Sequence, residues 1–237
     1  MKTKNSALII IDVQNDFCPG GALAVPDGDK TIPVINSISG VFYKVVASQD
    51  WHPENHISFA STHNREPYEV IEIKNMRLPR PPHPNPLPQG EREFLALNAE
   101  KLRQVLWPDH CVQGTFGSDF HKDLNLKPVN LIIRKGYNPA IDSYSAFLEN
   151  DKKTQTGLHY YLKGLKIKDV FFCGLATDYC VYFSAVDARK FGFKSYVILE
   201  ACRGVNVPQG NIKKAILTMQ KQGVKIIEKR QGLGLRV

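Results

Sequence analysis

The chain has 237 residues, of which 43% are hydrophobic and 23% charged, proportions that exclude a disordered, collagen-like or coiled-coil protein. No apolar run approaches the roughly 20 residues that a membrane-spanning helix needs. The net charge is +8, but Lys and Arg are scattered along the chain, which disfavours a nucleic-acid-binding protein because such proteins cluster their basic residues.

Short apolar runs alternate with helical patterns along the chain. Helices are predicted at 29–38, with Asp29 as the cap, at 160–165 as the end of a longer helix, at 179–191 and at 212–222. Strands are predicted at 7–11, 45–48, 129–134, 169–174, 194–200 and 224–229. Because these strands are apolar on both faces, we expect an α/β protein with three α-β-α layers around a mainly parallel central sheet. No phosphate-binding glycine motif is present, so nucleotide binding is not indicated.

One segment interrupts this alternation. Residues 78–93 hold six of the 15 prolines, which rules out a helix or a central strand there. We expect a single domain over 1–237 with a proline-rich loop inserted at about 69–93. An alternative interpretation is a proline-rich ligand for a partner protein.

The start of the chain and its cysteines indicate a cytoplasmic protein. The apolar run at 7–11 is too short for a signal peptide and ends in Asp12. The five cysteines are irregularly spaced and include no CxxC pair, so we expect free thiols. Cys173 lies inside a predicted strand and is expected in the core, whereas Cys18 and Cys111 lie beside candidate site residues; Cys202 suggests no function.

Polar residues follow four of the predicted strands. Ligands of open parallel sheets bind beyond the carboxyl ends of the strands. Asp12 follows the first strand, Asp50 and His52 the second, Lys135 the third, and Cys180 comes shortly after the fourth. Each residue alone is more typical of a turn or a core, but their occurrence at one sheet edge predicts a functional site.

Cys180 is the best candidate nucleophile. It lies just after Thr177 and Asp178, either of which can cap the next helix, so its sulfur is expected in the first turn, where the helix dipole lowers a thiol pKa. A thiol nucleophile also needs a base and a neighbouring cation. Asp12 can take the proton, and Lys135 can keep Asp12 ionised and stabilise negative charge.

A metal site is the second hypothesis. Asp50, His52 and His56 form a D-x-H-x-x-x-H pattern, and positions two apart in an extended segment face the same side. Asp50 and His52 can therefore reach one ion, with His110 as the best third ligand. One carboxylate and two histidines suit Zn, Fe or Mn. The alternative is a set of polar turn histidines.

Six segments of the chain resemble the nicotinamidase (pyrazinamidase) branch of the isochorismatase-like hydrolases. Three motifs within these segments are together specific for this family, namely DWHPxxH, WPDHCV and GLATDYCV. The segments follow the family order over nearly the whole chain. They lie at 9–23, 48–61, 106–117, 134–147, 174–181 and 201–205. The resemblance implies the isochorismatase-like hydrolase fold and a catalytic triad of Asp12, Lys135 and Cys180.

The resemblance also implies one divalent metal ion, Zn, Fe or Mn, held by Asp50, His52 and His110, with His56 as a secondary ligand. The family has a cis peptide before Ala176, and the backbone N–H groups of Ala176 and Cys180 would form an oxyanion hole.

The family's pocket walls correspond to Phe17, Leu23, Trp107 and Tyr144. Family members usually have a shorter connection between His56 and Trp107, so the proline-rich segment is a departure from the family pattern.

The implied reaction is the hydrolysis of nicotinamide to nicotinate and ammonia in NAD salvage, with pyrazinamide converted to pyrazinoate in the same way. The alternatives are a related hydrolase for another small amide, an isochorismatase-type ether hydrolase, which needs no cysteine nucleophile, and a non-catalytic family member. No nucleic-acid or membrane partner is expected, and a homo-oligomer is possible.

Overall fold

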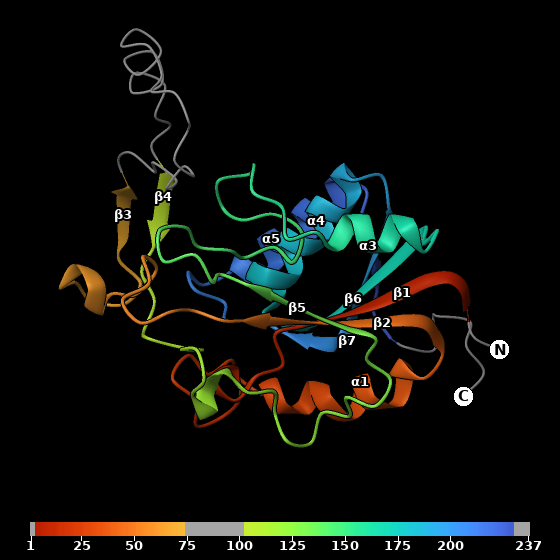
Figure 1. The fold of residues 1–237 in the computed structure, drawn as a ribbon, viewed down its shortest axis with the longest axis horizontal. Coiled ribbons are helices and arrows are strands. Elements are labelled where there is room, and N and C mark those ends of the chain that lie inside the picture. Colours follow the sequence, from red (N-terminus) through yellow and green to blue (C-terminus); the bar gives the residue numbers. More distant parts are fainter. Residues whose placement is uncertain (1–2, 74–101, 230–237) are drawn as a thin grey trace, which may run out of the picture.

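The computed structural model describes residues 3–73 and 102–229, and over these ranges a six-stranded sheet forms the centre of the molecule (Figure 1). The strand order is β5-β2-β1-β6-β7-β8, and every neighbouring pair is parallel. The strands are β1 (Thr3–Ile11), β2 (Phe42–Asp50), β5 (Leu131–Lys135), β6 (Asp169–Leu175), β7 (Lys194–Arg203) and β8 (Lys225–Ile227). The six predicted strands are thus confirmed.

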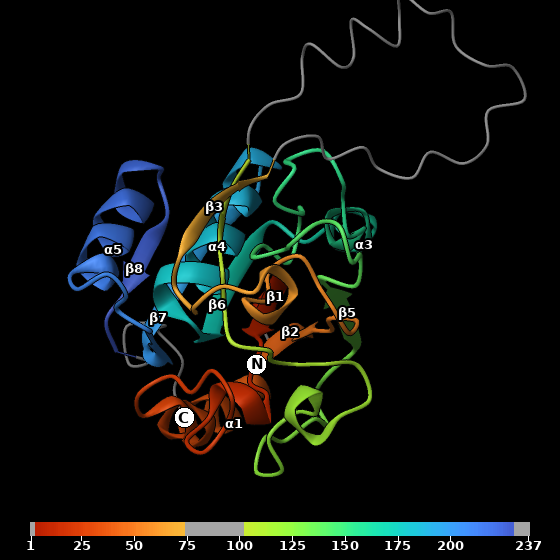
Figure 2. The same ribbon diagram turned by 90° about the vertical axis from the view of Figure 1, so that its left-hand side faces the viewer.

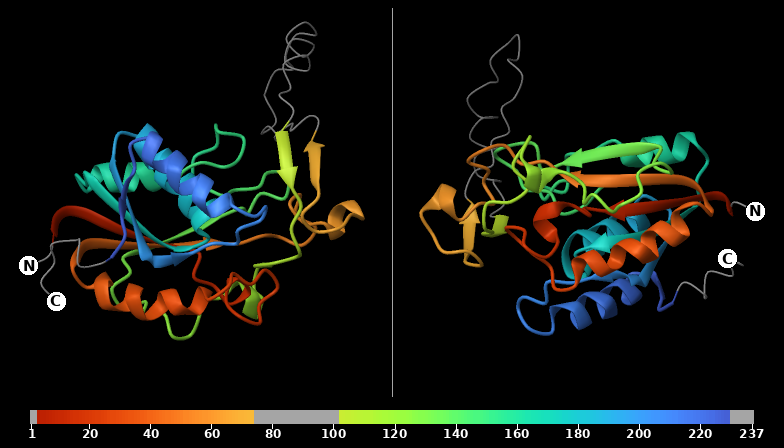
Figure 3. Two further views of the ribbon diagram at one scale, coloured as in Figure 1. Left: turned by 180° about the vertical axis from the view of Figure 1, so that it is seen from behind. Right: turned by 90° about the horizontal axis from the view of Figure 1, so that it is seen from below.

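Helices cover both faces of the sheet, as the sequence predicted. One face carries α1 (Thr31–Ser39), and the opposite face carries α3 (Leu158–Gly164), α4 (Tyr182–Lys190) and α5 (Asn211–Lys221). The view from behind in Figure 3 shows the same layers, and the view from below shows α1 in front of the sheet. The three-layer α-β-α fold is therefore confirmed.

The start of α1 differs from the prediction. Asp29 lies in a 3-10 turn, Gly28–Lys30, that precedes the helix, and the N-cap position of α1 is occupied by Lys30. The Thr31 hydroxyl instead donates to the Gly28 carbonyl at 2.7 Å. The expected Asp29 cap is wrong because the 3-10 turn shifts the start of the helix by two residues.

The structure also contains a two-stranded antiparallel ribbon that the sequence did not predict. It pairs β3 (Val70–Ile73) with β4 (Leu102–Val105). Figures 1 and 2 show the ribbon beyond the carboxyl edge of the main sheet. Strands this short carry too few alternating positions to give a pattern. Of the inserted loop predicted at about 69–93, residues 70–73 form β3, and residues 74–93, with all six prolines, lie outside the described residues.

The strand ends bring the candidate residues together. Residues 7–11 of β1 are completely buried, so the apolar run forms the middle of the core. Asp12 follows β1 directly, and Asp50 at the end of β2 pairs in register with Lys135 at the end of β5. The carboxyl edge of the sheet thus collects two carboxylates and an ammonium group. No described helix is long and apolar enough to cross a membrane.

Candidate active site

The Lys135 ammonium group lies at the centre of the site. Its Nζ is 2.9 Å from Asp12 Oδ2, 2.5 Å from Asp50 Oδ1 and 3.5 Å from Cys180 Sγ. It also donates to the carbonyl of Ser143 at 2.9 Å. Lys135 and Asp12 are completely buried, so each charge depends on the other for compensation. The three residues of the predicted triad are in contact through this one ammonium group.

The surroundings of Asp12 suit a proton acceptor. Burial raises the pKa of its carboxyl group, Lys135 opposes this, and Asp50 adds to the rise, so that the net shift is upward. Oδ1 accepts a hydrogen bond from the Ser48 hydroxyl at 2.6 Å. A carboxylate with a raised pKa takes a proton more readily than an exposed one, which is the property of a general base.

Cys180 lies in a π-helical turn, Thr177–Val181, between β6 and α4, and neither Thr177 nor Asp178 caps it. Burial raises the pKa of the thiol well above its usual value, and Asp12 adds to the rise against the opposing effect of Lys135. The predicted lowering of this pKa is wrong, because the desolvation of the sulfur outweighs favourable charges nearby. The thiol therefore keeps its proton until a base accepts it.

Asp178 has a different function from the predicted one. Its carboxylate accepts hydrogen bonds from the backbone N–H groups of Val205 and Asn206 at 3.0 and 2.9 Å. It thereby ties the segment after β7 to the turn that carries Cys180.

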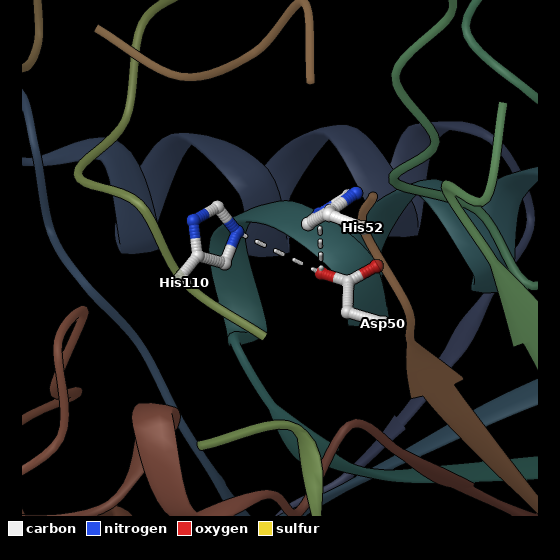
Figure 4. A group of neighbouring side chains, drawn as sticks. All are labelled: Asp50, His52 and His110. Atoms are coloured by element: carbon white, nitrogen blue, oxygen red, sulfur yellow. Dashed lines mark ion pairs between the residues drawn. The ribbon is translucent and has the colours of Figure 1, made fainter. Parts of the chain in front are cut away.

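Asp50, His52 and His110 converge as Figure 4 shows. Asp50 Oδ2 is 3.6 Å from His52 Nε2 and 4.0 Å from His110 Nε2. On the other side of the rings, His52 Nδ1 lies 2.8 Å from the Gly136 carbonyl, and His110 Nδ1 lies 2.7 Å from the Pro108 carbonyl. Because a carbonyl only accepts, each ring donates through Nδ1. This leaves Nε2, on the side of Asp50, as the nitrogen that can bind an ion, as in metal-binding histidines.

The buried nitrogen of His52 indicates that this group suits a cation. His52 Nε2 is buried and has no hydrogen-bond partner among the described residues. Burial is the main cause that lowers the pKa of His110 to about 4, so His110 is neutral near pH 7. A neutral imidazole is the form that binds a metal ion. The donor set of one carboxylate and two imidazoles therefore fits a divalent ion.

His56 lies behind His52. The two rings stack with their centroids 4.1 Å apart. The ring nitrogens of His56 contact the Ser58 hydroxyl at 2.7 Å and the Ile141 carbonyl at 3.2 Å. His56 therefore packs against a metal-site histidine, and its ligand atoms group with His52 and Asp142 rather than with Asp50 and His110.

We expect His52→Ala to lower the amount of bound divalent metal strongly, because it removes one of three converging ligand atoms. Elemental analysis of the purified protein measures this loss. His121→Ala is the matched control, since His121 lies outside the group and should leave the metal content unchanged. Wild-type metal content in His52→Ala would remove His52 from the ligand set.

Gln14 fixes the backbone of Asp50 and was not predicted. Its side-chain amide donates to the Asp50 carbonyl at 2.8 Å and accepts from the Asp50 N–H at 2.8 Å. The same amide nitrogen also donates to the Ser118 carbonyl. Its position two residues after Asp12, within the polar continuation of β1, was the signal that could have identified it.

A pocket opens beside these groups. All four predicted wall residues line it, namely Phe17, Leu23, Trp107 and Tyr144. The Trp107 indole N–H donates to the Tyr144 hydroxyl at 3.1 Å, which fixes two of the aromatic walls. Sequence reasoning missed four further lining residues, Val25, Asp142, Tyr179 and Val205. Cys18 and Cys111 are buried but do not line this pocket, and Cys173 is in the core as predicted.

The turn before Cys180 has the backbone that the resemblance implied. The Leu175–Ala176 peptide is cis, and Ala176 lines the pocket together with Cys180. The Ala176 carbonyl accepts hydrogen bonds from the N–H groups of Tyr179 and Val181, both at 3.1 Å.

Comparisons with known proteins agree with this geometry. The family model of the isochorismatase domain matches residues 6–231. The nicotinamidase of Acinetobacter baylyi is 44% identical over 230 residues, which cover 97% of this chain and 95% of the relative.

Two solved structures are similar over nearly their whole length. The nicotinamidase and pyrazinamidase of Acinetobacter baumanii has a TM-score of 0.84 and 46% identity, over 98% of this chain and 100% of that one. The pyrazinamidase of Pyrococcus horikoshii in complex with zinc has a TM-score of 0.69 and 34% identity, over 94% and 98%. The chain therefore belongs to the isochorismatase family.

Proposed function

We propose that this protein is a metal-dependent cysteine amidohydrolase that converts nicotinamide to nicotinate and ammonia in NAD salvage, and pyrazinamide to pyrazinoate. The observation that carries the proposal is the contact of one buried ammonium group, Lys135, with both Asp12 and Cys180. The nicotinamidase relatives, which match this chain along nearly all of its length, support the substrate.

In this mechanism Asp12 accepts the thiol proton as Cys180 attacks the amide carbon of the substrate. The N–H groups of Ala176 and Cys180 stabilise the oxyanion, and one such donor contributes about 3 kcal/mol to transition-state stabilisation. Protonated Asp12 then gives its proton to the departing ammonia. A water molecule, deprotonated by Asp12, cleaves the thioester, and the proton returns to the sulfur as nicotinate leaves.

Lys135 acts as a fixed positive charge in this scheme. Burial disfavours its charged form, but Asp12 and Asp50 outweigh this effect and raise the pKa of its ammonium group well above the usual value. Lys135 therefore stays protonated through the cycle. Its charge stabilises the thiolate as it forms and the carboxylate that is regenerated.

The divalent ion belongs at Asp50, His52 and His110. When bound there, it would coordinate the ring nitrogen of the substrate and so orient the carboxamide toward Cys180. The apolar walls, which include Phe17 and Trp107, would hold the ring itself. Zinc is the first candidate, because the Pyrococcus pyrazinamidase was solved in complex with it, and iron and manganese suit the same ligands.

The proposal is tested by ammonia release from nicotinamide, measured with and without a chelator. We expect rapid release by the metal-loaded protein, a strong loss after chelation, and recovery on adding back Zn²⁺, Fe²⁺ or Mn²⁺. Parallel reactions with pyrazinamide and with aliphatic amides compare substrate classes. No release from nicotinamide, with turnover of another amide, would assign the protein to a different hydrolase of the family.

We further propose that residues 1–237 form one domain, with the segment at about 69–93 as an insertion that does not shape the active site. Deletion of residues 79–92 is then expected to leave kcat/KM for nicotinamide close to the wild-type value. The reason is that the antiparallel pairing of β3 with β4 places Ile73 opposite Leu102, which closes the base of the insertion. A large loss of kcat/KM with an unchanged melting temperature would contradict this.

A further inference from the structure

A third carboxylate, Asp142, lies next to the proposed metal centre and has no function in the mechanism above. Only 2% of it is exposed, and it lines the same pocket as Asp50, His110 and Cys180. Its ligand atoms come within 4.8 Å of those of His52 and His56. Asp142 therefore lies between the substrate space and His52, one of the three proposed metal ligands.

The hydrogen bonds of Asp142 fix its position but do not neutralise its charge. Oδ1 accepts from the backbone N–H of Ser143 at 2.7 Å, and Oδ2 accepts from the side-chain amide of Gln104 at 2.8 Å. In the described part of the chain, no Lys or Arg forms an ion pair with it. A buried carboxylate without a cationic partner is costly, so this one calls for a positive charge nearby.

The formal charges of the site show what that positive charge would be. The count takes Asp12, Asp50 and Asp142, all buried, as ionised and the histidines as neutral, the form that binds a metal ion. Among the described residues, one ammonium group, that of Lys135, forms ion pairs in this cluster, with Asp12 and Asp50. Three negative charges and one positive charge leave a formal charge of −2, which a single divalent cation balances. The unpartnered Nε2 of His52 is the independent sign that such a cation binds here.

Gln104 connects this carboxylate to the β3–β4 ribbon. It lies on β4, opposite Ile71 of β3, and is 1% exposed. Its amide nitrogen donates to Asp142 Oδ2 and to the Val105 carbonyl, whereas its own oxygen has no partner in the described residues. Since a carboxylate only accepts hydrogen bonds, the bond to Asp142 determines the orientation of the amide.

We propose that Asp142 is an outer carboxylate of the metal centre, which strengthens the binding of the divalent ion by its charge, and that Gln104 holds it in place from the ribbon. This inference rests on the proposed function only for the location of the ion at Asp50, His52 and His110. Asp142 acts on the ion through charge and through His52, and Gln104 is a positioning residue that acts through Asp142.

The test is the affinity of the chelator-stripped full chain for Zn²⁺, measured by competition with a chromophoric chelator. Asp142→Asn keeps the shape of the side chain and removes its charge, and we expect it to weaken Zn²⁺ binding by about 10–100-fold, the range found when outer partners of a metal site are removed. Glu54→Gln is the matched control. It removes the same charge from an exposed residue between His52 and His56, and solvent and salt screen such charges, so its Zn²⁺ affinity should stay near wild type.

A second variant keeps the inference testable if Asp142→Asn folds poorly, which circular dichroism and the melting temperature of the stripped protein report. Gln104→Met has a similar shape but no donor, and we expect it to weaken Zn²⁺ binding less than Asp142→Asn does. Combined with Asp142→Asn, it should cause no additional loss, because Gln104 acts only through the carboxylate.

Wild-type Zn²⁺ affinity in Asp142→Asn would overturn the inference, as would a lower melting temperature without a change in affinity. If Asp142→Asn does not fold, wild-type affinity in Gln104→Met overturns it. Failure of the proposed function has a different signature, namely a wild-type protein that binds Zn²⁺ with the expected dependence on Asp142 but releases no ammonia from nicotinamide.

Discussion

Cys180→Ala is expected to abolish ammonia release from nicotinamide while the protein keeps its metal. Among the described residues, Cys180 supplies the only sulfur that both lines the pocket and contacts Lys135, so no covalent intermediate can form in the variant. Loss of a nucleophile costs about 10⁴-fold or more in kcat where this has been measured in other hydrolases. The measurements are single-turnover ammonia release and elemental analysis of the same preparation.

Cys173→Ala is the control for this experiment, because Cys173 is buried in β6 and does not line the pocket. We expect it to retain activity with at most a modest loss of stability. Residual turnover of Cys180→Ala near the wild-type rate would show that the sulfur is not the nucleophile. Loss of metal together with activity would instead indicate a folding defect.

Lys135→Met is expected to affect both stability and activity. Removing the ammonium group leaves the carboxylates of Asp12 and Asp50 buried without their cation. Breaking a buried ion pair in this way costs about 3–5 kcal/mol in the free energy of unfolding. Ammonia release should also be lost, because the thiolate of Cys180 then forms without a neighbouring positive charge.

The sign of the pH dependence follows from Asp12. Burial already raises the pKa of this carboxyl group, and without Lys135 the pKa rises further. A carboxyl group with a raised pKa in the folded state binds its proton more tightly there than in the unfolded state, so the deficit is largest above the folded pKa. The stability loss of Lys135→Met should therefore shrink as pH falls toward the ordinary range of an aspartate.

Urea unfolding of the chelator-treated protein at several pH values measures this deficit. Lys168→Met, at an exposed lysine, is the control and should change the unfolding free energy by no more than about 0.5 kcal/mol. A deficit for Lys135→Met that stays constant from neutral to acidic pH would contradict the assignment of Asp12 as its source.

The strands and the site at their ends were predictable because both depend on local patterns. A buried parallel strand is a short run of apolar residues, and 7–11 is such a run with all five residues completely buried. The first polar residue after such a strand marks the sheet edge, which located Asp12 and Lys135. The resemblance added the pocket walls Phe17 and Trp107, which no local pattern indicates.

The parts that were not predictable depend on contacts between distant segments. The β3–β4 ribbon joins residues 70–73 to residues 102–105 across the proline-rich segment. Gln104 and Asp142 meet across 38 positions of the chain. Neither residue type nor spacing gives a signal for such a pair, since a glutamine in a short strand and an aspartate in a loop are both common.

The protonation state of the Cys180 thiol shows most clearly what depends on local sequence and what depends on tertiary structure. By itself the sequence determined which thiol follows the fourth predicted strand at the sheet edge, and which carboxylate and ammonium group lie at that edge. Only the tertiary structure decided that the thiol of Cys180 keeps its proton, because desolvation and the distances to Asp12 and Lys135 depend on how the whole core closes around it. Local sequence determines where a strand ends, whereas the charge state of a buried group is determined by everything that surrounds it.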